Sequence, residues 1–286
     1  MKNRFRHTAG ILSILLTLPA LVSAQRTEFG YWLGGSTYTG DLNTNTSFQD
    51  TRQSLGIYYR YNYDSRVAVK TSAYWSQVAG NDAHSDNKFQ LNRNLNFYSD
   101  VYEVSSQIEF NFKPYSSQNK KDKWAPYFIA GFSLLSFNPK TTYEGSVVRL
   151  QPLGTEGQGL PEYPDRELYK LRTTAWVVGG GLKVKLSKNL SFHIEGANRK
   201  THTDYLDDVS LTYVPRNIML NENPVNGFQA AALADRSASG EPGANAQGGK
   251  QRGDLKKRDS YFYFGIGFSF TINRYNCPFV ENRGSR

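Results

Sequence analysis

VYEVSSQIEFNF, residues 101–112, alternates large apolar and polar side chains along most of its length. The large apolar side chains share one phase: Tyr102, Val104, Ile108, Phe110 and Phe112. The opposite phase carries the polar ones: Glu103, Ser105, Gln107, Glu109 and Asn111. Because successive side chains of a strand point to opposite faces of a sheet, this period of two predicts a strand with one apolar face. The stretch is longer than the typical strand of about 5–6 residues and suits the roughly 9–11 that cross a bilayer at a tilt.

The same alternation recurs along the chain, and helical periodicity is not apparent. Residues 55–62 and 260–272 repeat it with aromatic side chains on the apolar face. Eight segments are predicted as strands: 27–39, 54–62, 66–79, 99–113, 125–138, 173–187, 189–200 and 259–273. Strands in this order, with one short and one long connection in turn, are typical of an up-and-down barrel.

The lengths of the connections give the second signal. The short ones are residues 63–65, 114–124 and Lys188, and the long ones are 40–53, 80–98, 139–172 and 201–258. Short turns on one rim and long loops on the other are typical of outer-membrane barrels. The sequence therefore predicts an all-β fold over residues 25–273, an eight-stranded antiparallel up-and-down outer-membrane β-barrel with short periplasmic turns and long extracellular loops.

A soluble barrel or sandwich is the alternative, because alternation does not say whether the apolar face points inward or outward. The glycines favour the membrane barrel. They share the phase of the polar residues in most strands: Gly56, Gly131, Gly179, Gly181, Gly265 and Gly267. A solvated face has no need of glycine, whereas a crowded eight-stranded interior needs small residues beside its polar ones. The aromatic-rich face is therefore predicted to meet lipid.

Charged residues of both signs fall on the inward phase. An eight-stranded barrel holds side chains and no sizeable aqueous channel, which argues against a porin. Charges in a narrow lumen must be paired, so we expect a buried, structural ion-pair network. Its predicted members are Arg60, Lys70, Glu103, Glu109, Lys183, Lys185, His193, Glu195 and Arg199.

The first 24 residues are predicted to be a secretory signal peptide, with a basic start, an apolar run at 9–21 and a small-residue cleavage site at 22–24. The net charge of +9 includes three basic residues of this signal peptide, so the mature chain has 31 Lys or Arg against 25 Asp or Glu, a net charge of +6. For an exported chain this charge points to a solvated surface or an anionic lipopolysaccharide boundary, and nucleic acid is not an expected partner. Residues 256–258, Lys-Lys-Arg, would form a basic rim able to meet lipopolysaccharide phosphates, or ordinary solvated charges. The even strand count places both ends of the mature barrel, and the tail 274–286, in the periplasm.

Cys277 is the only cysteine in the chain, which excludes a disulfide-stapled scaffold. It lies four residues beyond the end of the last predicted strand. An unpaired cysteine in the oxidising periplasm suggests an intermolecular disulfide with a periplasmic or lipoprotein partner. A buried, inert thiol is the alternative, and the polar character of residues 273–277 argues against it.

Three loop segments invite a chemical interpretation. QPLGTEGQG, residues 151–159, lacks the ending and the strand-to-helix setting of nucleotide-binding loops, so we expect a glycine-shaped packed loop and no cofactor. THTDYLDD, residues 201–208, brings Asp204, Asp207 and Asp208 together, a weak candidate for a hard cation such as Ca²⁺ against a solvated or salt-bridged loop. Residues 227–253, rich in Ala, Gly, Ser and Gln, are expected to form a mobile outer loop.

His202 and Asp204 also raise the possibility of a hydrolase at the outer rim. Such an enzyme would need a nucleophile or an activated water, and neighbouring Ser210 and Thr203 carry no mark of activation. We therefore expect no enzymatic activity.

Four motifs together resemble the PorG family: GDLN at 40–43, YRYN at 59–62, QPLGTEGQG at 151–159 and RKTHTDYLDDVS at 199–210. The glycine-rich and TDYLDD motifs are the most specific, through Gly154, Glu156, Gly157, Gly159, Asp204, Tyr205, Asp207 and Asp208. Members are outer-membrane components of the type IX secretion system of Bacteroidota, which exports virulence factors or gliding-motility adhesins. The resemblance implies an eight-stranded barrel that contacts the periplasmic ring of the PorK lipoprotein and PorN, with a non-enzymatic anchoring role. An adhesin acting through the long outer loops and a rim hydrolase remain the alternatives.

Overall fold

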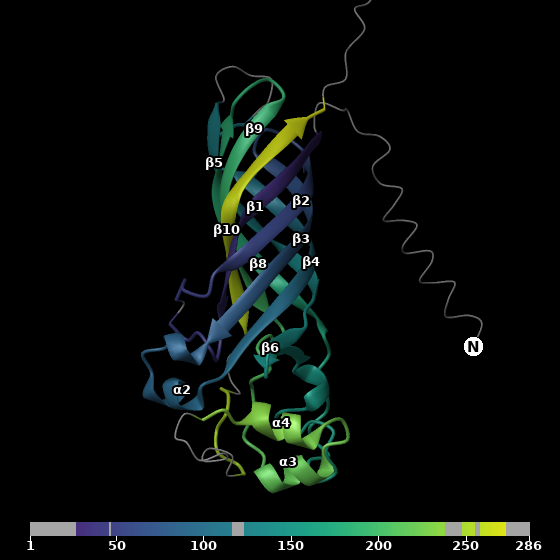
Figure 1. The fold of residues 1–286 in the computed structure, drawn as a ribbon. Coiled ribbons are helices and arrows are strands. Elements are labelled where there is room, and N and C mark those ends of the chain that lie inside the picture. The colour runs from purple at the N-terminus through teal and green to yellow at the C-terminus, as the bar shows by residue number, and fades with distance from the viewer. Residues whose placement is uncertain (1–26, 46, 116–122, 238–247, 255–257, 273–286) are drawn as a thin grey trace, which may run out of the picture.

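The computed structural model describes residues 27–45, 47–115, 123–237, 248–254 and 258–272. Eight long strands form the barrel: β1 (Thr27–Thr39), β2 (Arg52–Asn62), β3 (Val67–Asn81), β4 (Asn96–Asn111), β5 (Trp124–Ser136), β8 (Arg172–Lys185), β9 (Leu190–Thr201) and β10 (Ser260–Thr271). All pairs are antiparallel, and the pairing of β3 with β4 closes the ring (Figure 1). The prediction of an eight-stranded antiparallel barrel is confirmed.

The two faces of each strand divide as the alternation predicts. On β4, Ile108 is 62 % exposed, whereas the neighbouring Glu109 is fully buried inside the barrel. Aromatic and aliphatic side chains point outward around the wall, and soluble monomers rarely expose continuous apolar patches above a few hundred Å². The outer surface is therefore that of a membrane-spanning barrel. A Cβ added to Gly56 would lie 2.2 Å from the Tyr74 ring, so this glycine makes room for a tyrosine in the lumen.

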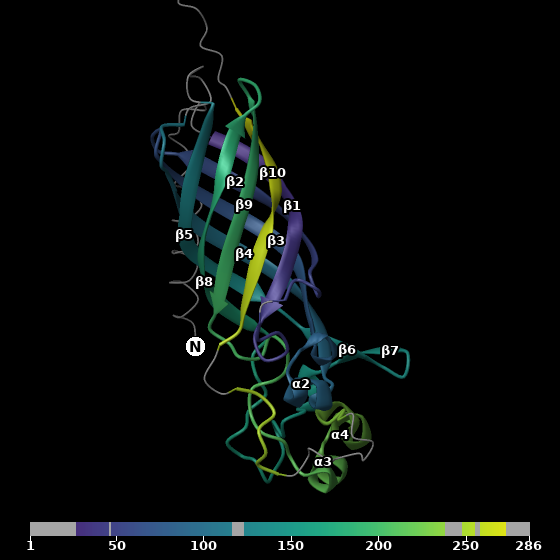
Figure 2. The ribbon, with the colours of Figure 1, turned by 90° about the vertical axis from the view of Figure 1, so that its left-hand side faces the viewer.

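The long connections are more structured than the sequence predicts. They contain two short 3-10 turns, a hairpin and three helices: η2 (Asp82–His84), α2 (Lys88–Arg93), β6 (Pro139–Tyr143), β7 (Ser146–Arg149), η3 (Gln151–Leu153), α3 (Arg216–Glu222) and α4 (Gly227–Ala234). The hairpin of β6 and β7 projects sideways (Figure 2). No helix of the described residues is both long and apolar enough to cross a membrane.

The expectation of a mobile loop is wrong for residues 227–234, which form α4. Alanine has the highest intrinsic helix propensity, and Asn226 caps the helix by accepting from the backbone N–H of Gln229 at 3.1 Å. Ala230, Ala231 and Leu233 are buried against neighbouring loops. The segment therefore gains its order from tertiary packing that a composition of small residues does not reveal.

We call the described parts of the connections 40–51, 82–95, 137–171 and 202–259 the loop cap. The loop cap lies at the end of the barrel opposite the short connections (Figure 1). Its apolar side chains, such as Leu153 and Leu206, form one cluster with strand residues at the barrel mouth, such as Val101 and Tyr261. The cap and the barrel therefore share a continuous core. The expected signal peptide (1–24), Lys256, Lys257, Cys277 and the tail 274–286 lie outside the described residues.

Candidate functional site

Ionic side chains bridge the barrel lumen from wall to wall. The guanidinium of Arg60 on β2 contacts Glu28 at 2.8 Å and Glu109 at 3.1 Å. Lys183 on β8 also pairs with Glu109. Glu109 therefore accepts from two cations carried by different strands.

Two further ion pairs cross the lumen. Lys70 on β3 donates to Glu195 on β9 at 2.5 Å, and the Tyr127 hydroxyl donates to the same oxygen at 2.8 Å. Arg199 on β9 meets Glu103 on β4 at 2.9 Å. These pairs join opposite walls, so the side chains fill the interior instead of lining a channel.

The remaining predicted lumen residues lie at the edges of this network. His193 is buried, with Nε2 2.9 Å from the hydroxyl of Ser269. Lys185 is only half-buried near the short-turn end of β8. Glu28 was not predicted, although it shares the inward phase of Trp32 on β1, a signal that could have found it. With Glu28 included, the described strands bury four carboxylates and four Lys or Arg side chains, a balanced set.

The two most specific loop motifs pack against each other. The Glu156 carboxylate accepts from the backbone N–H groups of Ser210 and Leu211, both at 3.0 Å. In the opposite direction, Asp208 accepts from the hydroxyls of Thr155 at 2.5 Å and Tyr169 at 2.6 Å. The acidic residues of both motifs thus serve to join residues 151–159 to residues 204–211.

Two buried arginines hold this contact to the rest of the loop cap. Arg252 donates to the Glu156 carboxylate at 3.0 Å and to the Asp208 carbonyl at 2.7 Å. Arg93, at the end of α2, pairs with Asp82 at 2.7 Å and donates to the Arg252 carbonyl at 2.7 Å. Neither arginine was predicted, because non-periodic loop sequence does not indicate which charged residues become buried.

A tyrosine lies between two buried carboxyl groups at the barrel mouth. The Tyr38 hydroxyl lies 2.5 Å from Asp207 Oδ2 and 2.8 Å from Asp259 Oδ1. A phenol has one proton to donate, so one of the two carboxyl groups must carry a proton to complete both hydrogen bonds. Consistent with this, burial raises the pKa of Asp207 and of Asp259 well above the usual range.

Burial raises the pKa of three further carboxyl groups in the loop cap. The pKa of Asp204 rises to about 7, and those of Asp41 and Asp208 rise to about 6. Each accepts hydrogen bonds from protein donors, Asp204 from the Ser210 hydroxyl at 2.7 Å. Within the described residues, no group of three His, Cys, Asp or Glu side chains is arranged to hold a metal ion. The three carboxyl groups of Asp204, Asp207 and Asp208 accept hydrogen bonds from separate donors and do not converge on one point.

The proposed histidine–aspartate pair is not assembled. The Nδ1 atom of His202 lies 2.8 Å from the Thr174 hydroxyl, and the ring is exposed beside Trp176. Asp204 is instead bonded to Ser210. His202 therefore has Thr174, not Asp204, as its hydrogen-bond partner.

A family model described as a domain of unknown function (DUF6089) matches residues 7–150, just over half of the chain. This chain belongs to the DUF6089 family. The matched part of the DUF6089 chain contains the first five barrel strands and the β6–β7 hairpin. No curated protein sequence matches it.

Solved structures similar to this DUF6089 protein include outer-membrane barrels. The N-terminal barrel domain of OprF from Pseudomonas aeruginosa is 13 % identical with a TM-score of 0.36, covering 86 % of this chain and 98 % of that one. Neisserial surface protein A is 9 % identical with a TM-score of 0.41, covering 86 % and 96 %. Ail of Yersinia pestis, in complex with the heparin analogue sucrose octasulfate, is 8 % identical with a TM-score of 0.40, covering 86 % and 97 %.

Proposed function

We propose that this DUF6089 protein is a non-enzymatic outer-membrane barrel that anchors or positions the periplasmic ring of the type IX protein secretion machinery. The observation that carries the proposal is the lumen: ion pairs such as Lys70–Glu195 and Arg199–Glu103 join opposite walls. A barrel cross-linked in this way is a rigid scaffold and not a conduit. The resemblance of its loop motifs to the PorG family supports the choice of machine.

The proposed orientation places the loop cap outside the cell and both chain ends in the periplasm. The apolar outer wall and the basic, then apolar, start of the sequence support an outer-membrane location. The ring proteins PorK and PorN would then meet the short connections, including 114–124, and the tail that carries Cys277.

Co-purification tests this role directly. The tagged full-length protein is extracted from membranes in mild detergent, and the bound proteins are identified by mass spectrometry. PorK and PorN should be recovered, and their absence under conditions that preserve the ring would refute the anchoring role. Non-reducing electrophoresis of the wild type and Cys277→Ser then tests the disulfide: a thiol-sensitive, high-mass species should be present only in the wild type.

An adhesin or ligand-binding barrel is the second candidate, favoured by exposed apolar side chains on the cap. Leu220 lies on α3 and Phe228 on α4, with Val225 between the helices, and all three are exposed. For an adhesin, Phe228→Ser should weaken attachment of cells to a surface while leaving recovery of PorK and PorN unchanged. Unchanged attachment together with unchanged recovery of PorK and PorN would favour the anchor.

A further inference from the structure

An outward-facing groove lies on the barrel wall just below the loop cap. It has a volume of about 670 Å³ and is lined by residues of β3, β4, β5 and β8, near the cap-side end of β5, whose last pair is Tyr102 with Ser136. Its wall is formed mainly by the apolar side chains of Tyr102, Val104 and Leu134, all of which are more than half exposed. Ser136, Arg172 and Thr173 border its cap-side end, although nearly all of the exposed surface that lines the groove is apolar. The groove is therefore an apolar surface of the kind that an acyl chain covers, with polar side chains only along its cap-side edge.

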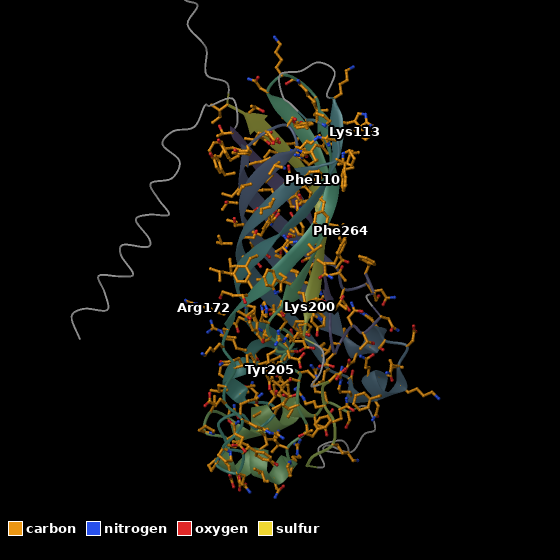
Figure 3. All side chains as sticks on the ribbon, turned by 180° about the vertical axis from the view of Figure 1, so that it is seen from behind. Phe110, Lys113, Arg172, Lys200, Tyr205 and Phe264 are labelled. Atoms are coloured by element: carbon orange, nitrogen blue, oxygen red, sulfur yellow. The ribbon has the colours of Figure 1, made fainter. Side chains whose placement is uncertain are left out.

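Arg172 places an exposed positive charge at the cap-side edge of this groove. Its guanidinium contacts no carboxylate of the described residues, whereas nearby Lys140 is neutralised by Asp100 at 2.8 Å. Lys200 on β9 lies at a similar height (Figure 3), and its ammonium donates to the carbonyl of Arg258. These cations border the wall at the level where the barrel meets the loop cap.

Trp176 indicates the depth of the groove in the membrane. It pairs with Lys200 across β8 and β9, is more than half exposed, and packs its ring 5.8 Å from that of Phe132. Exposed tryptophan between an apolar wall and a polar cap is typical of the membrane–water interface, where aromatic girdles flank the apolar band. Arg172, four residues closer to the cap on the same strand, thus lies at the level of lipid headgroups.

We propose that this groove binds one lipopolysaccharide molecule, with an acyl chain along Tyr102, Val104 and Leu134 and a lipid A phosphate on Arg172. A guanidinium is suited to a phosphate because it offers parallel N–H donors to two oxygens. The choice of lipopolysaccharide rests on the proposed orientation, which puts the cap-side rim in the outer leaflet. A headgroup phosphate supplies the negatively charged partner that Arg172 lacks among the described residues.

Purified full-length protein in detergent micelles gives the test, because it involves no ring protein. Binding is measured with intact lipopolysaccharide, the same lipopolysaccharide after removal of its phosphates, and phosphatidylethanolamine. Intact lipopolysaccharide should bind most tightly, and Arg172→Glu should weaken its binding by about tenfold or more, because the charge-assisted hydrogen bonds to the phosphate are lost and replaced by charge repulsion. Leu134→Ser should weaken the binding of every lipid that carries an acyl chain.

Lys113→Glu is the matched control, because this lysine lies near the opposite rim, over the Trp124 ring (Figure 3). It should leave lipid binding unchanged. The shift in gel mobility between unheated and heated samples verifies that each variant is a folded barrel. Equal affinity for the phosphate-free lipid, or for Arg172→Glu and the wild type, would overturn the proposal, as would equal binding of phosphatidylethanolamine. Recovery of PorK and PorN is measured separately, so failure of the anchoring role is distinguishable from failure of the lipid site.

Discussion

Glu109 is the residue on which the lumen network most depends. It is fully buried and contacts both Arg60 and Lys183. Its partners come from different strands, so this one carboxylate connects β2, β4 and β8. Removing one member of a buried pair leaves an uncompensated charge, which costs far more than the pair itself contributes.

Glu109→Gln should therefore lower the free energy of unfolding by about 3–5 kcal/mol. The amide keeps the size of the side chain but leaves the cations in excess within the lumen. Urea unfolding in lipid vesicles, followed by tryptophan fluorescence, measures the change. Glu167→Gln, on the exposed surface of the loop cap, is the control and should have almost no effect. Equal stability of the two variants would contradict a structural lumen network.

The buried carboxyl groups of the loop cap predict a pH dependence. The pKa of Asp204 is raised to about 7, and that of Asp41 to about 6, above the unfolded value of about 3.9. The folded cap therefore binds more protons than the unfolded cap between these pH values, so cap stability should fall as the pH rises from about 4 to about 7. The nearby Arg93 and Arg252 stay charged throughout and do not alter the sign.

Hydrogen exchange of the loop cap, corrected for the intrinsic rate at each pH, measures this dependence. Protection in residues 204–211 should decrease as the pH rises, and Asp204→Asn should flatten the curve because one titrating group is lost. Protection in β4 provides the internal comparison. A cap that gains protection over the same interval would contradict the prediction.

At the scale of elements, the loop 151–159 takes its shape from glycines. Gly154, Gly157 and Gly159 have φ of +55°, +83° and +81°, a region that other residues rarely occupy. The turn directs Thr155 and Glu156 into the 204–211 segment. The sequence indicated a glycine-shaped loop, and the structure adds the segment on which it packs.

Gly157→Ala should undock this loop, and Gly159→Ala should do so much less. A Cβ at Gly157 would lie 2.7 Å from the Val214 side chain, whereas a Cβ at Gly159 would meet no atom within 4 Å. Both variants incur backbone strain of about 1 kcal/mol, but only the first adds a clash. Limited proteolysis of the loop cap should cleave Gly157→Ala fastest, and equal rates for the two variants would contradict the packing argument.

At the scale of the whole molecule, the barrel is a closed body plugged by its own side chains. Cross-lumen pairs such as Lys70–Glu195 fill the interior, and the loop cap seals the mouth with a shared apolar core. We expect no steady ion conductance from the wild type in planar bilayers. Arg199→Ala combined with Glu103→Ala removes one cross-lumen pair without leaving an unpaired charge. This double variant should admit more water to the lumen but should still form no open pore. A stable open channel in the wild type would contradict the proposal that the barrel is a closed scaffold.

The barrel can be predicted from the sequence, because alternation with a period of two indicates which side chains share a face of the sheet. The alternation at residues 101–112 and 260–272 predicts an outward-facing apolar wall. The number of strands follows from the positions of the turns between them. The inward charges such as Arg60 and Glu109 are found in the same way. Their partners are not, because register across the lumen depends on closure of the whole sheet.

The arrangement of the loop cap depends on tertiary contacts that the sequence does not indicate. Arg93, Arg252 and Asp259 lie far apart in the chain and have no periodic pattern, yet they are buried together with Glu156 and Asp207. Helix α4 likewise follows from the packing of small side chains against loops, not from an amphipathic repeat. Loops acquire their structure from long-range contacts. Their sequence therefore identifies the residues of the motifs but does not predict which surfaces those residues contact.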